Sequence, residues 1–330
     1  MTFVPAEWAR HRTLWVGWPS HPDLWQGDLS QARAEVSALV KTLANPGGEQ
    51  VHLLCSGTEA AAAAQVAMIG VNNVTVEEGL FGDIWLRDTG PIFTTPHVAH
   101  GFVFNGWGGK YQLPGDEAVS RQIAQRSGAS LARHAFVLEG GALDHDGDGT
   151  VLTTRQCLLN HNRNPGWSEA DAEAALKEAL GVRKVLWLGE GLANDHTDGH
   201  VDNLARFIAP GEVVCPMAWG REDQNADVYD AAAKDLAAMT DAAGRKLTVH
   251  RIPSPGRVVD ADGYAVPASH MNFIIANEVV IMPVYAERPG LLAVEAMGVF
   301  MPDKRVIGLR SHALLTGGGS FHCITQQQPD

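Results

Sequence analysis

The sequence lacks several features that would assign it to a common class of protein. It has only four cysteines in 330 residues and no C-x-x-C spacing, which disfavours a structural zinc site or a disulfide scaffold and favours reduced thiols. No run approaches the roughly 20 uncharged apolar residues of a membrane span. The first eight residues also lack a basic stretch followed by an apolar one. We therefore expect a soluble cytoplasmic protein that does not associate with membranes.

Positive charge is also scarce. The chain has 25 Lys and Arg against 38 Asp and Glu, a formal net charge of −13. This balance argues against nucleic acid as a partner and fits either an acidic solvated surface or a cationic substrate. Hydrophobic residues make up 45% of the chain, which is ample for a core. Because no low-complexity linker interrupts the sequence, we expect residues 1–330 to form a single domain.

Hydrophobic patterning predicts a repeating order of elements. We expect a strand at 13–18, a helix at 29–44, a strand at 51–55 and a helix at 59–69. Later strands are expected at 101–104, 135–138, 150–154, 184–188, 204–208, 212–215, 247–252, 272–276, 279–284 and 305–309, with helices at 117–126, 169–180 capped by Ser168, 227–243 and 291–297. A strand, strand, helix, strand unit thus recurs about every 50–65 residues, which indicates a ring of about five similar modules.

Polar residues cluster just before the first strand of each unit. The clusters are Arg87-Asp88, Glu139-Gly140-Gly141, His200-Val201-Asp202, Ser269-His270 and His322-Cys323. In a ring of repeats these positions converge on one face near the axis. The pattern therefore predicts one shared site.

Cys323 is the candidate nucleophile. It follows three glycines and His322 and lies seven residues from the C-terminus within an apolar segment, so we expect this chain end to be docked. Glycines allow a substrate close to the main chain, and their amides can donate to developing negative charge. A thiolate needs nearby positive charge or amide dipoles. A small buried cysteine without a catalytic role is the alternative for this segment taken alone.

The carboxylate and histidine candidates have structural alternatives too. Asp88 could pair with Arg87 or bond to turn amides, and Glu139, which enters a Gly-Gly turn, could face a pocket or solvent. His200 and Asp202 are two residues apart, so on the expected strand both side chains point to one face. A carboxylate there would keep the imidazole charged to higher pH. A surface His–Asp pair is the alternative.

Two metal motifs are incomplete. Asp144 to Thr150 begins like a calcium loop, but Arg155 stands where such a loop needs a bidentate Glu, so we expect a polar hairpin turn. His196, His200 and Asp202 could form a metal triad, but Gly199 interrupts the helix that a histidine pair at this spacing needs. A metal-dependent hydrolase is therefore the second mechanism.

Together these motifs resemble the agmatine deiminases and the related bacterial peptidyl-arginine deiminases, which are guanidine-modifying penteins. The matching stretches run nearly end to end: Pro5-Ala-Glu-Trp8, Trp18-Pro-Ser-His-Pro-Asp23, Trp85-Leu-Arg-Asp-Thr-Gly-Pro91, Phe104-Asn-Gly-Trp-Gly-Gly109, Glu139-Gly-Gly141, Leu152-Thr-Thr154, Cys157-Leu-Leu-Asn160, Asn162-Arg-Asn-Pro165, Gly199-His-Val-Asp-Asn203, Asn272-Phe273, Gly317-Gly-Gly319 and His322-Cys-Ile-Thr-Gln-Gln327.

The resemblance implies a fold and a set of roles. The fold is a five-bladed α/β propeller of ββαβ units. Cys323 would be the nucleophile and His200 the acid–base residue, and Asp88 and Asp202 would hold the guanidinium nitrogens. Glu139 would support the histidine side of the site. Trp85 and Trp107 would line the pocket.

The implied reaction converts agmatine to N-carbamoylputrescine and ammonia, a step in the breakdown of arginine to polyamines, through a covalent amidino-cysteine intermediate and without a metal or cofactor. A homo-oligomer is also expected from relatives. Alternatives are a deiminase of free or peptidyl arginine, an amidinotransferase, or a non-catalytic protein that binds a cationic metabolite or another protein.

The sequence departs from the family pattern at positions that concern the substrate's tail. The family often has a second acid at the position of Gly82, and agmatine deiminases often have Asn at the position of Asp198. The segment 253–268 is shorter than in many agmatine deiminases and rich in Pro and Gly, so it could be a mobile flap over the site. The guanidinium chemistry is hardly affected.

Overall fold

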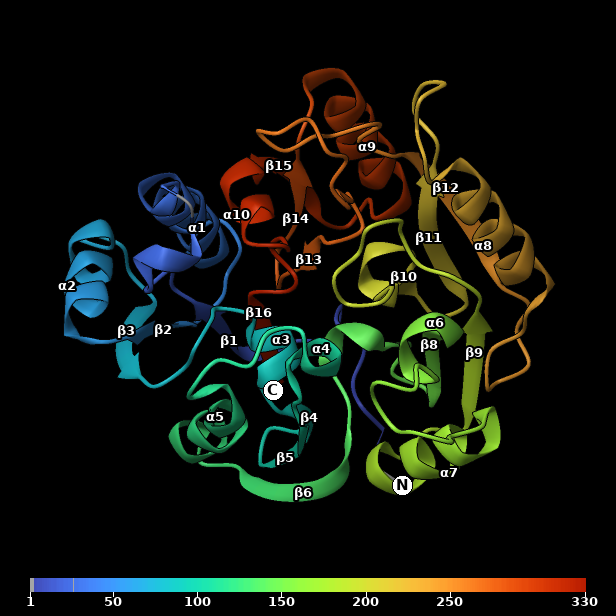
Figure 1. Cartoon of the computed structure of the whole chain (residues 1–330), viewed down its shortest axis with the longest axis horizontal. Helices are drawn as coiled ribbons and strands as arrows, with labels where there is room; N and C mark the ends of the chain where they lie inside the picture. Colours follow the sequence, from blue (N-terminus) through green and yellow to red (C-terminus); the bar gives the residue numbers. More distant parts are fainter. Residues whose placement is uncertain (1–2, 26) are drawn as a thin grey trace.

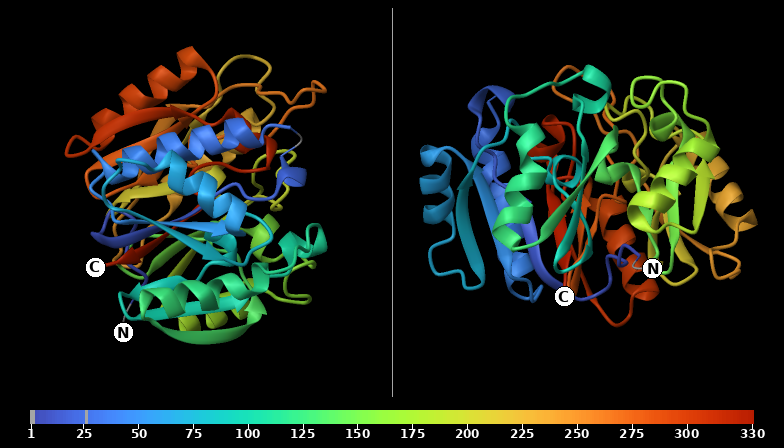
Figure 2. Two further views of the ribbon diagram at one scale, coloured as in Figure 1. Left: turned by 90° about the vertical axis from the view of Figure 1, so that its left-hand side faces the viewer. Right: turned by 90° about the horizontal axis from the view of Figure 1, so that it is seen from below.

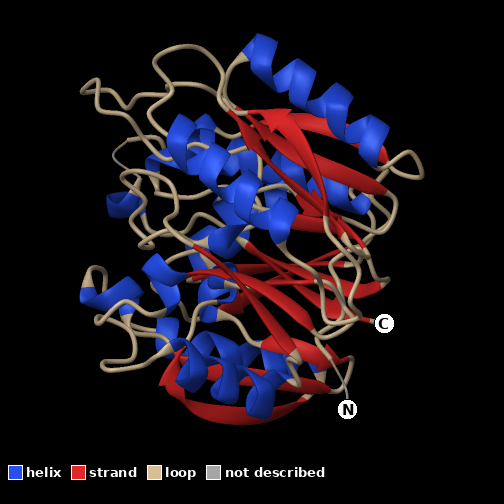
Figure 3. Cartoon of the chain, turned by 90° about the vertical axis from the view of Figure 1, so that its right-hand side faces the viewer, coloured by secondary structure: helices blue, strands red, loops and turns tan. Residues whose placement is uncertain are grey.

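The computed structural model describes residues 3–25 and 27–330, so Met1, Thr2 and Gln26 of the expected domain lie outside the described part. Five small sheets surround a central axis, with the long helices on the outside (Figures 1 and 3). This arrangement is the five-bladed α/β propeller that the resemblance implied, and it confirms the repeat read from the sequence.

Four sheets share one plan. The second strand pairs antiparallel with the first and parallel with the third, and a helix joins the second and third strands. The first of these sheets contains β4 (Ile92–Thr95), β5 (Val98–Val103), α5 (Val119–Ser127) and β6 (Ser130–Val137); the second contains β7 (Asp144–His145), β8 (Thr150–Thr154), α7 (Glu169–Leu180) and β9 (Lys184–Leu188); the third contains β10 (Arg206–Ala209), β11 (Glu212–Met217), α8 (Ala226–Ala238) and β12 (Thr248–Pro253); the fourth contains β13 (Ile274–Ile275), β14 (Val279–Val284), α9 (Glu287–Phe300) and β15 (Arg305–Arg310).

The fifth sheet combines the two ends of the chain. Its order is β16-β1-β2-β3, with β16 antiparallel to β1 and β2 parallel to both β1 and β3. Its elements are β16 (Thr325–Pro329), β1 (His11–Gly17), α1 (Leu29–Ala44), β2 (Val51–Ser56), α2 (Thr58–Ala67) and β3 (Val74–Gly79). The C-terminal strand is thus the first strand of the N-terminal blade, and both chain ends lie on one face (Figure 2). The expected docking of this end is confirmed.

Local sequence explains where the regular elements begin and end. Ser168 accepts from the backbone of Asp171 while the Asp171 side chain accepts from the Ser168 backbone, so α7 starts with a capping box. The helix stops at Gly181, whose φ of 72° favours glycine. In α1 the buried side chains recur at helical spacing along one face.

The sequence prediction fails at the inner edge of the blades. We expected His200 and Asp202 on a strand, but Val201–Asn203 form the 3-10 helix η4 and His200 precedes it. The backbone N–H of His200 donates to Thr197 Oγ1, and Gly199 has a φ of 90°, so a tight polar turn replaces the extended backbone. The expected strand at 204–208 consequently begins only at Arg206.

Short helical turns complete the structure. They are η1 (Pro22–Leu24), α3 (Leu86–Thr89), α4 (Gly106–Gly109), η2 (Asp116–Ala118), η3 (Gly140–Ala142), α6 (Arg155–Leu158) and α10 (His312–Thr316). The expected hairpin turn at Asp144 to Thr150 is present, with Asp146 accepting from the backbone of Asp148 and Thr150. Within 3–25 and 27–330, no helix has the length and apolar character needed to cross a membrane.

Candidate active site

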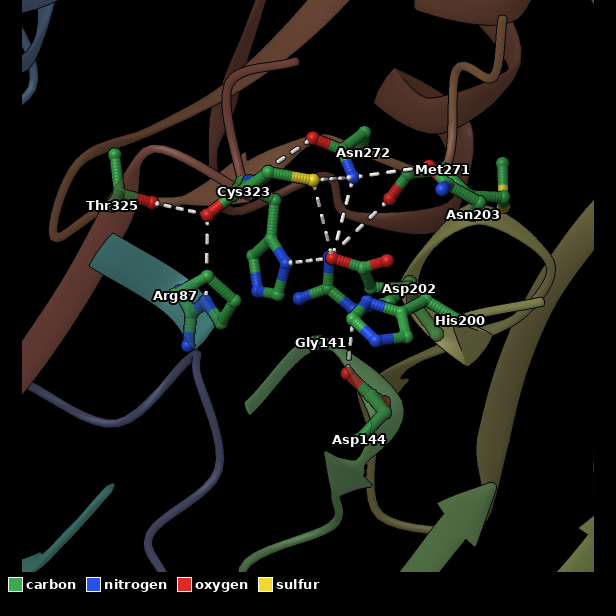
Figure 4. Close-up of polar contacts among 12 residues, drawn as sticks. Arg87, Gly141, Asp144, His200, Asp202, Asn203, Met271, Asn272, Cys323 and Thr325 are labelled. Atoms are coloured by element: carbon green, nitrogen blue, oxygen red, sulfur yellow. Dashed lines mark hydrogen bonds and ion pairs between the residues drawn. The ribbon is translucent and has the colours of Figure 1, made fainter. Parts of the chain in front are cut away.

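The polar turns that precede the inner strands meet at the axis of the propeller, as the sequence predicted. Asp88 lies in α3 before β4, Glu139 precedes η3 and β7, and Asp202 lies in η4 before β10. Cys323 precedes β16, and Asn272 precedes β13. Figure 4 shows the Cys323 sulfur directed toward the Asn272 amide and the Asp202 carboxylate, with His200 beside Asp202. The five blades therefore each contribute a polar side chain to one region at the axis.

Cys323 is 6% exposed and held by Asn272. The amide nitrogen Nδ2 of Asn272 lies 3.0 Å from Sγ, and Oδ1 of the same amide accepts from the Cys323 backbone N–H at 3.2 Å. Sγ also lies 3.7 Å from Oδ2 of Asp202. Burial, followed by the charges of Asp202 and Asp88, raises the pKa of this thiol well above its ordinary value. Without a bound cation the group is a neutral thiol.

His200 is fully buried and has no hydrogen-bond partner on either ring nitrogen among the described residues. Its Nδ1 lies 3.8 Å from Oδ1 of Asp88. Burial alone would lower the pKa of His200, but Asp88, Cys157 and Asp202 together raise it well above its ordinary value. The raised pKa favours the imidazolium form, and Asp88, Glu139 and Cys157 lie close to its ring nitrogens.

Asp88 is oriented by a backbone amide and an indole rather than by Arg87. Oδ1 accepts from the Gly141 N–H at 2.9 Å and Oδ2 from Trp107 Nε1 at 2.9 Å. The Arg87 side chain instead donates through Nε to the His322 carbonyl. A Cβ on Gly141 would lie 2.5 Å from His200 Nδ1 and 2.9 Å from Asp88 Oδ1, so this close approach requires glycine.

Glu139 is 1% exposed and faces the histidine side of the site. Its Oε1 accepts from Nε of the buried Arg163 at 2.6 Å. Burial raises the pKa of Glu139, although Arg163 and His200 oppose this. One carboxylate oxygen, Cys157 Sγ and a His200 nitrogen lie within 4.8 Å of one another. In the described part of the chain this is the only group of three such side chains close enough to share a metal ion.

The alternative metal triad is not assembled. His196 is exposed, stacks on Tyr111 and shares a 2.9 Å hydrogen bond with its hydroxyl, whereas His200 is buried. His196 belongs to no group of metal-ligand side chains within residues 3–25 and 27–330. The structure therefore does not bring His196, His200 and Asp202 together as ligands.

A cavity of about 230 Å³ leads to Cys323 and Asp88. Trp85 and Trp107 line it, as expected, and its other lining residues are Leu24, Asp83, Tyr111, Leu113, His196, Thr197 and Thr316 to Gly319. Its charged lining groups are carboxylates, and no Lys or Arg is among these described residues. The wall is thus aromatic and acidic, a lining suited to an elongated cation.

Sequence reasoning missed several residues around this site. Asn272 was matched to the family without a role, and His322 was seen only as a neighbour of Cys323. Glu7, Cys157 and Arg163 were in matching stretches but were not singled out. Each is a buried polar or thiol group far from its partner in sequence, and its place becomes visible only when the ring is closed.

Comparison with known proteins places this geometry in a family. The model of the Porphyromonas-type peptidyl-arginine deiminases matches residues 3–329. The chain is 37% identical to an agmatine deiminase of Ectopseudomonas mendocina (strain ymp), over 99% of this chain and 95% of that protein.

Two solved structures are similar throughout. The agmatine deiminase of Enterococcus faecalis has a TM-score of 0.91 and 33% identity, covering 100% of this chain and 96% of that one. A Cys-to-Ser variant of the C. jejuni agmatine deiminase, solved with substrate bound, has a TM-score of 0.90 and 25% identity, covering 100% and 97%.

Proposed function

The chain belongs to the Porphyromonas-type peptidyl-arginine deiminase family, and on this premise we propose that it hydrolyses agmatine to N-carbamoylputrescine and ammonia. It is a guanidine-modifying hydrolase. The observation that carries the proposal is that the Cys323 thiol and the Asp88 carboxylate line an acidic aromatic cavity, while the Asp202 carboxylate lies 3.7 Å from the thiol and the His200 imidazole 3.8 Å from Asp88. Each of these groups has a task in guanidinium hydrolysis.

Asp88 and Asp202 bind the guanidinium group of the substrate. A guanidinium is planar and permanently charged, so Asp88 and Asp202 hold its nitrogens and direct its carbon toward sulfur. Trp107 and Gly141 fix the Asp88 carboxylate through its two oxygens, which limits its rotation. Trp85 and Trp107 flank the methylene groups of the bound agmatine.

Cys323 and His200 carry out the covalent steps of the reaction. The cation neutralises the carboxylates that raise the thiol pKa, so binding itself favours the thiolate. Attack on the guanidinium carbon gives a tetrahedral adduct, and His200 protonates the departing ammonia. His200 then takes a proton from water, which attacks the amidino-thioether and releases the ureido product and the free cysteine. The sum is one guanidinium cation plus water giving one neutral ureido group plus ammonium, whose extra proton is the one that the Cys323 thiol loses on forming the thiolate. No step needs a metal or cofactor.

The cavity lining supports agmatine over free arginine. The lining carboxylates are Asp83 and Asp88, and the described lining holds no Lys or Arg to pair with an α-carboxylate. Agmatine has an ammonium group at its far end and no carboxylate, so it meets only favourable charges. An arginine inside a peptide also lacks a free α-carboxylate. Agmatine therefore has to be compared directly with such a peptide as a substrate.

The remaining expectations accompany this proposal. We propose that residues 1–330 act as one catalytic domain in the cytoplasm, on a small cationic substrate and without nucleic-acid or membrane partners. A homo-oligomer is proposed from the family resemblance.

The test is release of ammonia and ureido product by metal-stripped protein. Agmatine, free arginine and peptides with internal or terminal arginine are compared, with and without an added amine acceptor. Turnover of agmatine alone supports the proposal. Preference for arginine, a peptide or transfer to the amine would retain the guanidine chemistry and refute the substrate, and activity restored only by zinc would favour a metal hydrolase.

Cys323→Ser is the matched test of the residue assignment. It should abolish turnover while thermal melting stays nearly unchanged, because serine is close in size. Cys55→Ser is its control, since Cys55 is equally buried but lies in β2 away from the site. Substantial activity in the Cys323 variant would remove that residue from the mechanism.

A further inference from the structure

A chain of buried charges connects the N-terminal segment to the candidate site. Oε2 of Glu7 lies 3.1 Å from His322 Nε2, and His322 Nδ1 lies 2.8 Å from Oδ2 of Asp202. The same Asp202 oxygen is 3.3 Å from Asn272 Nδ2 and 3.7 Å from Cys323 Sγ. All these side chains are at most 8% exposed. The chain therefore runs without interruption from residue 7 to the thiol.

Both carboxylates in this chain are ionised. Burial alone would raise the pKa of Glu7, but Arg206 and His322 more than compensate and hold it well below its ordinary range. The pKa of Asp202 is likewise lowered, because hydrogen bonding to His322 and its charge outweigh burial. An ionised carboxylate only accepts, so both His322 ring nitrogens must donate. Each ring nitrogen of His322 thus faces a carboxylate oxygen, one from Glu7 and one from Asp202.

Neither Glu7 nor His322 contacts the proposed substrate cavity. Both line a separate small space of about 30 Å³, together with Arg87, Asp144 and His145, which has room for only a few waters. The other Glu7 oxygen accepts from the Ile275 backbone at 2.8 Å, and Arg206 fixes Oε2. Glu7 can therefore act on a substrate only through His322.

We propose that Glu7 and His322 are positioning residues that keep Asp202 ionised and aimed at the guanidinium. The inference rests on the proposed guanidine hydrolysis. His322 supplies one fixed N–H and one positive charge to Asp202, and Glu7 supplies the counter-charge that keeps His322 doubly protonated. The N-terminal segment, which the sequence alone leaves without a role, is then a working part of the active site.

The proposal makes a prediction about the acid limb of the pH profile, which is the range in which kcat/KM falls as the pH is lowered. If His322 loses its charge, the pKa of Asp202 rises, and a larger fraction of Asp202 is protonated at a given pH. A protonated Asp202 holds the guanidinium weakly. The acid limb of kcat/KM therefore moves to higher pH, and the loss appears in KM more than in kcat at pH values below neutrality.

The test compares Glu7→Gln and His322→Asn with wild type. Glu7→Gln removes the counter-charge at nearly constant shape, and His322→Asn keeps one N–H donor without charge. Each should lower kcat/KM for agmatine at about pH 7 by roughly 10- to 100-fold, because Asp202, although still ionised at this pH, loses the contact that orients it. Each should also move the acid limb up by about one pH unit.

Asp144→Asn is the matched control. Asp144 is buried, pairs with the same Arg206 and accepts from the Phe207 backbone, but it has no contact with His322. Like Glu7→Gln, this substitution replaces one of the two carboxylates that pair with Arg206 by a neutral amide. The two variants should therefore lose similar thermal stability. Only Glu7→Gln should shift the acid limb. Equal pH profiles for the two variants would overturn the proposal and make Glu7 structural.

A second readout does not depend on turnover. In 15N-histidine NMR of the wild-type protein, both ring nitrogens of His322 should carry protons at about neutral pH, and Glu7→Gln should abolish this for one of them. A neutral His322 in wild type would refute the proposal even if agmatine is hydrolysed. A doubly protonated His322 in a protein inactive on agmatine would support the charge chain and refute only the proposed substrate.

Discussion

At the scale of single residues, the site places negative charge rather than positive charge beside its thiol. Asp202 and Asp88 both raise the pKa of Cys323, and both also raise that of His200. The resting pair is thus a thiol and an imidazolium, whereas many reactive cysteines rely on permanent neighbouring cations. In the proposed reaction a cationic substrate supplies the missing charge when it binds, which would tie activation of Cys323 to the correct ligand.

This arrangement makes an unusual prediction for alkylation. Asp202→Asn should abolish hydrolysis yet accelerate alkylation of Cys323 by iodoacetamide, because removing the anion lowers the thiol pKa and increases the thiolate fraction. At about pH 8 we expect roughly tenfold faster labelling, equivalent to about one pKa unit. Mass spectrometry of the peptide containing Cys323 measures the rate.

Two of the other three thiols, Cys55 and Cys215, serve as internal controls for that experiment. Burial raises the pKa of Cys55 to about 12 and that of Cys215 to about 11, and neither lies near Asp202. Their labelling should be slow and unchanged by the substitution. Labelling of Cys323 that slows in the variant would contradict the electrostatic account.

The glycine run before Cys323 gives a second prediction at this scale. A Cβ on Gly319 would lie 2.5 Å from Cζ3 of Trp85, so Gly319→Ala must displace the indole from the cavity wall. We expect kcat/KM for agmatine to fall roughly tenfold or more, since small misplacements in a site are costly. Gly189→Ala is the control, because a Cβ there meets nothing within 4 Å. Equal kinetics for both variants would exclude a role for this close packing.

At the scale of elements, the sequence predicts the outer parts of each blade better than the inner parts. α1 was expected at its observed bounds, and α7 was found from its capping serine, because caps and helical spacing are local signals. The inner strands are short, and β13 has only two residues. Their backbone is set by the polar turns before them, which explains why a strand was wrongly expected at His200.

The candidate site could be located from sequence, but its connections could not. Polar clusters before each inner strand indicated where Asp88, Glu139 and Cys323 would meet, since equivalent positions in a ring converge. The contact between Glu7 and His322 spans 315 residues of sequence. It depends on how the ends of the chain close the ring, and no local pattern encodes that distance.

The turn before α5 contains an element-scale prediction about pH and stability. Asp116 Oδ1 accepts from the backbone of Gly82 and Asp83, while Oδ2 is buried without a partner. Burial raises the pKa of Asp116 to about 6. Between about pH 4 and 6 the folded protein holds a proton here that the unfolded chain releases, so this group's contribution to stability falls as pH rises.

Asp116→Asn should remove this loss of folding stability at higher pH, because asparagine carries no charge. It should keep both backbone hydrogen bonds that Oδ1 accepts. The variant should therefore be more stable than wild type above about pH 6, by about 3 kcal/mol at most, and the difference should shrink toward pH 4. Chemical denaturation at a series of pH values measures it. A variant that is equally destabilised at every pH would show that the carboxylate's charge is not the cause.

At the scale of the whole molecule, closure of the ring and assembly of the site are the same event. β16 pairs with β1 in its own sheet, and its side chains reach the next blade: Gln326 donates to the Pro91 carbonyl, and Gln328 donates to the Pro96 carbonyl at 2.8 Å. Cys323 stands two residues before this strand. The last residues of the chain therefore fix the nucleophile against blades formed by the first third of the sequence.

Removal of residues 327–330 should consequently affect both stability and chemistry. The truncation deletes the partners of His11, Thr13 and Leu14 in β1, and several ladder hydrogen bonds at about 1 kcal/mol each are lost. We expect the melting temperature to fall by roughly 10 °C and agmatine hydrolysis to disappear. Removing Asp330 alone should have a much smaller effect on both, because it lies beyond β16, is exposed and loses only its contacts with Arg10. Gln328→Ala keeps the strand but deletes its side-chain bond to the Pro96 carbonyl. If closure of the ring positions Cys323, this variant should lose part of its agmatine turnover together with part of its thermal stability, and both losses should be smaller than in the truncation. A truncated chain with full activity would mean that the ring holds its site without its last strand.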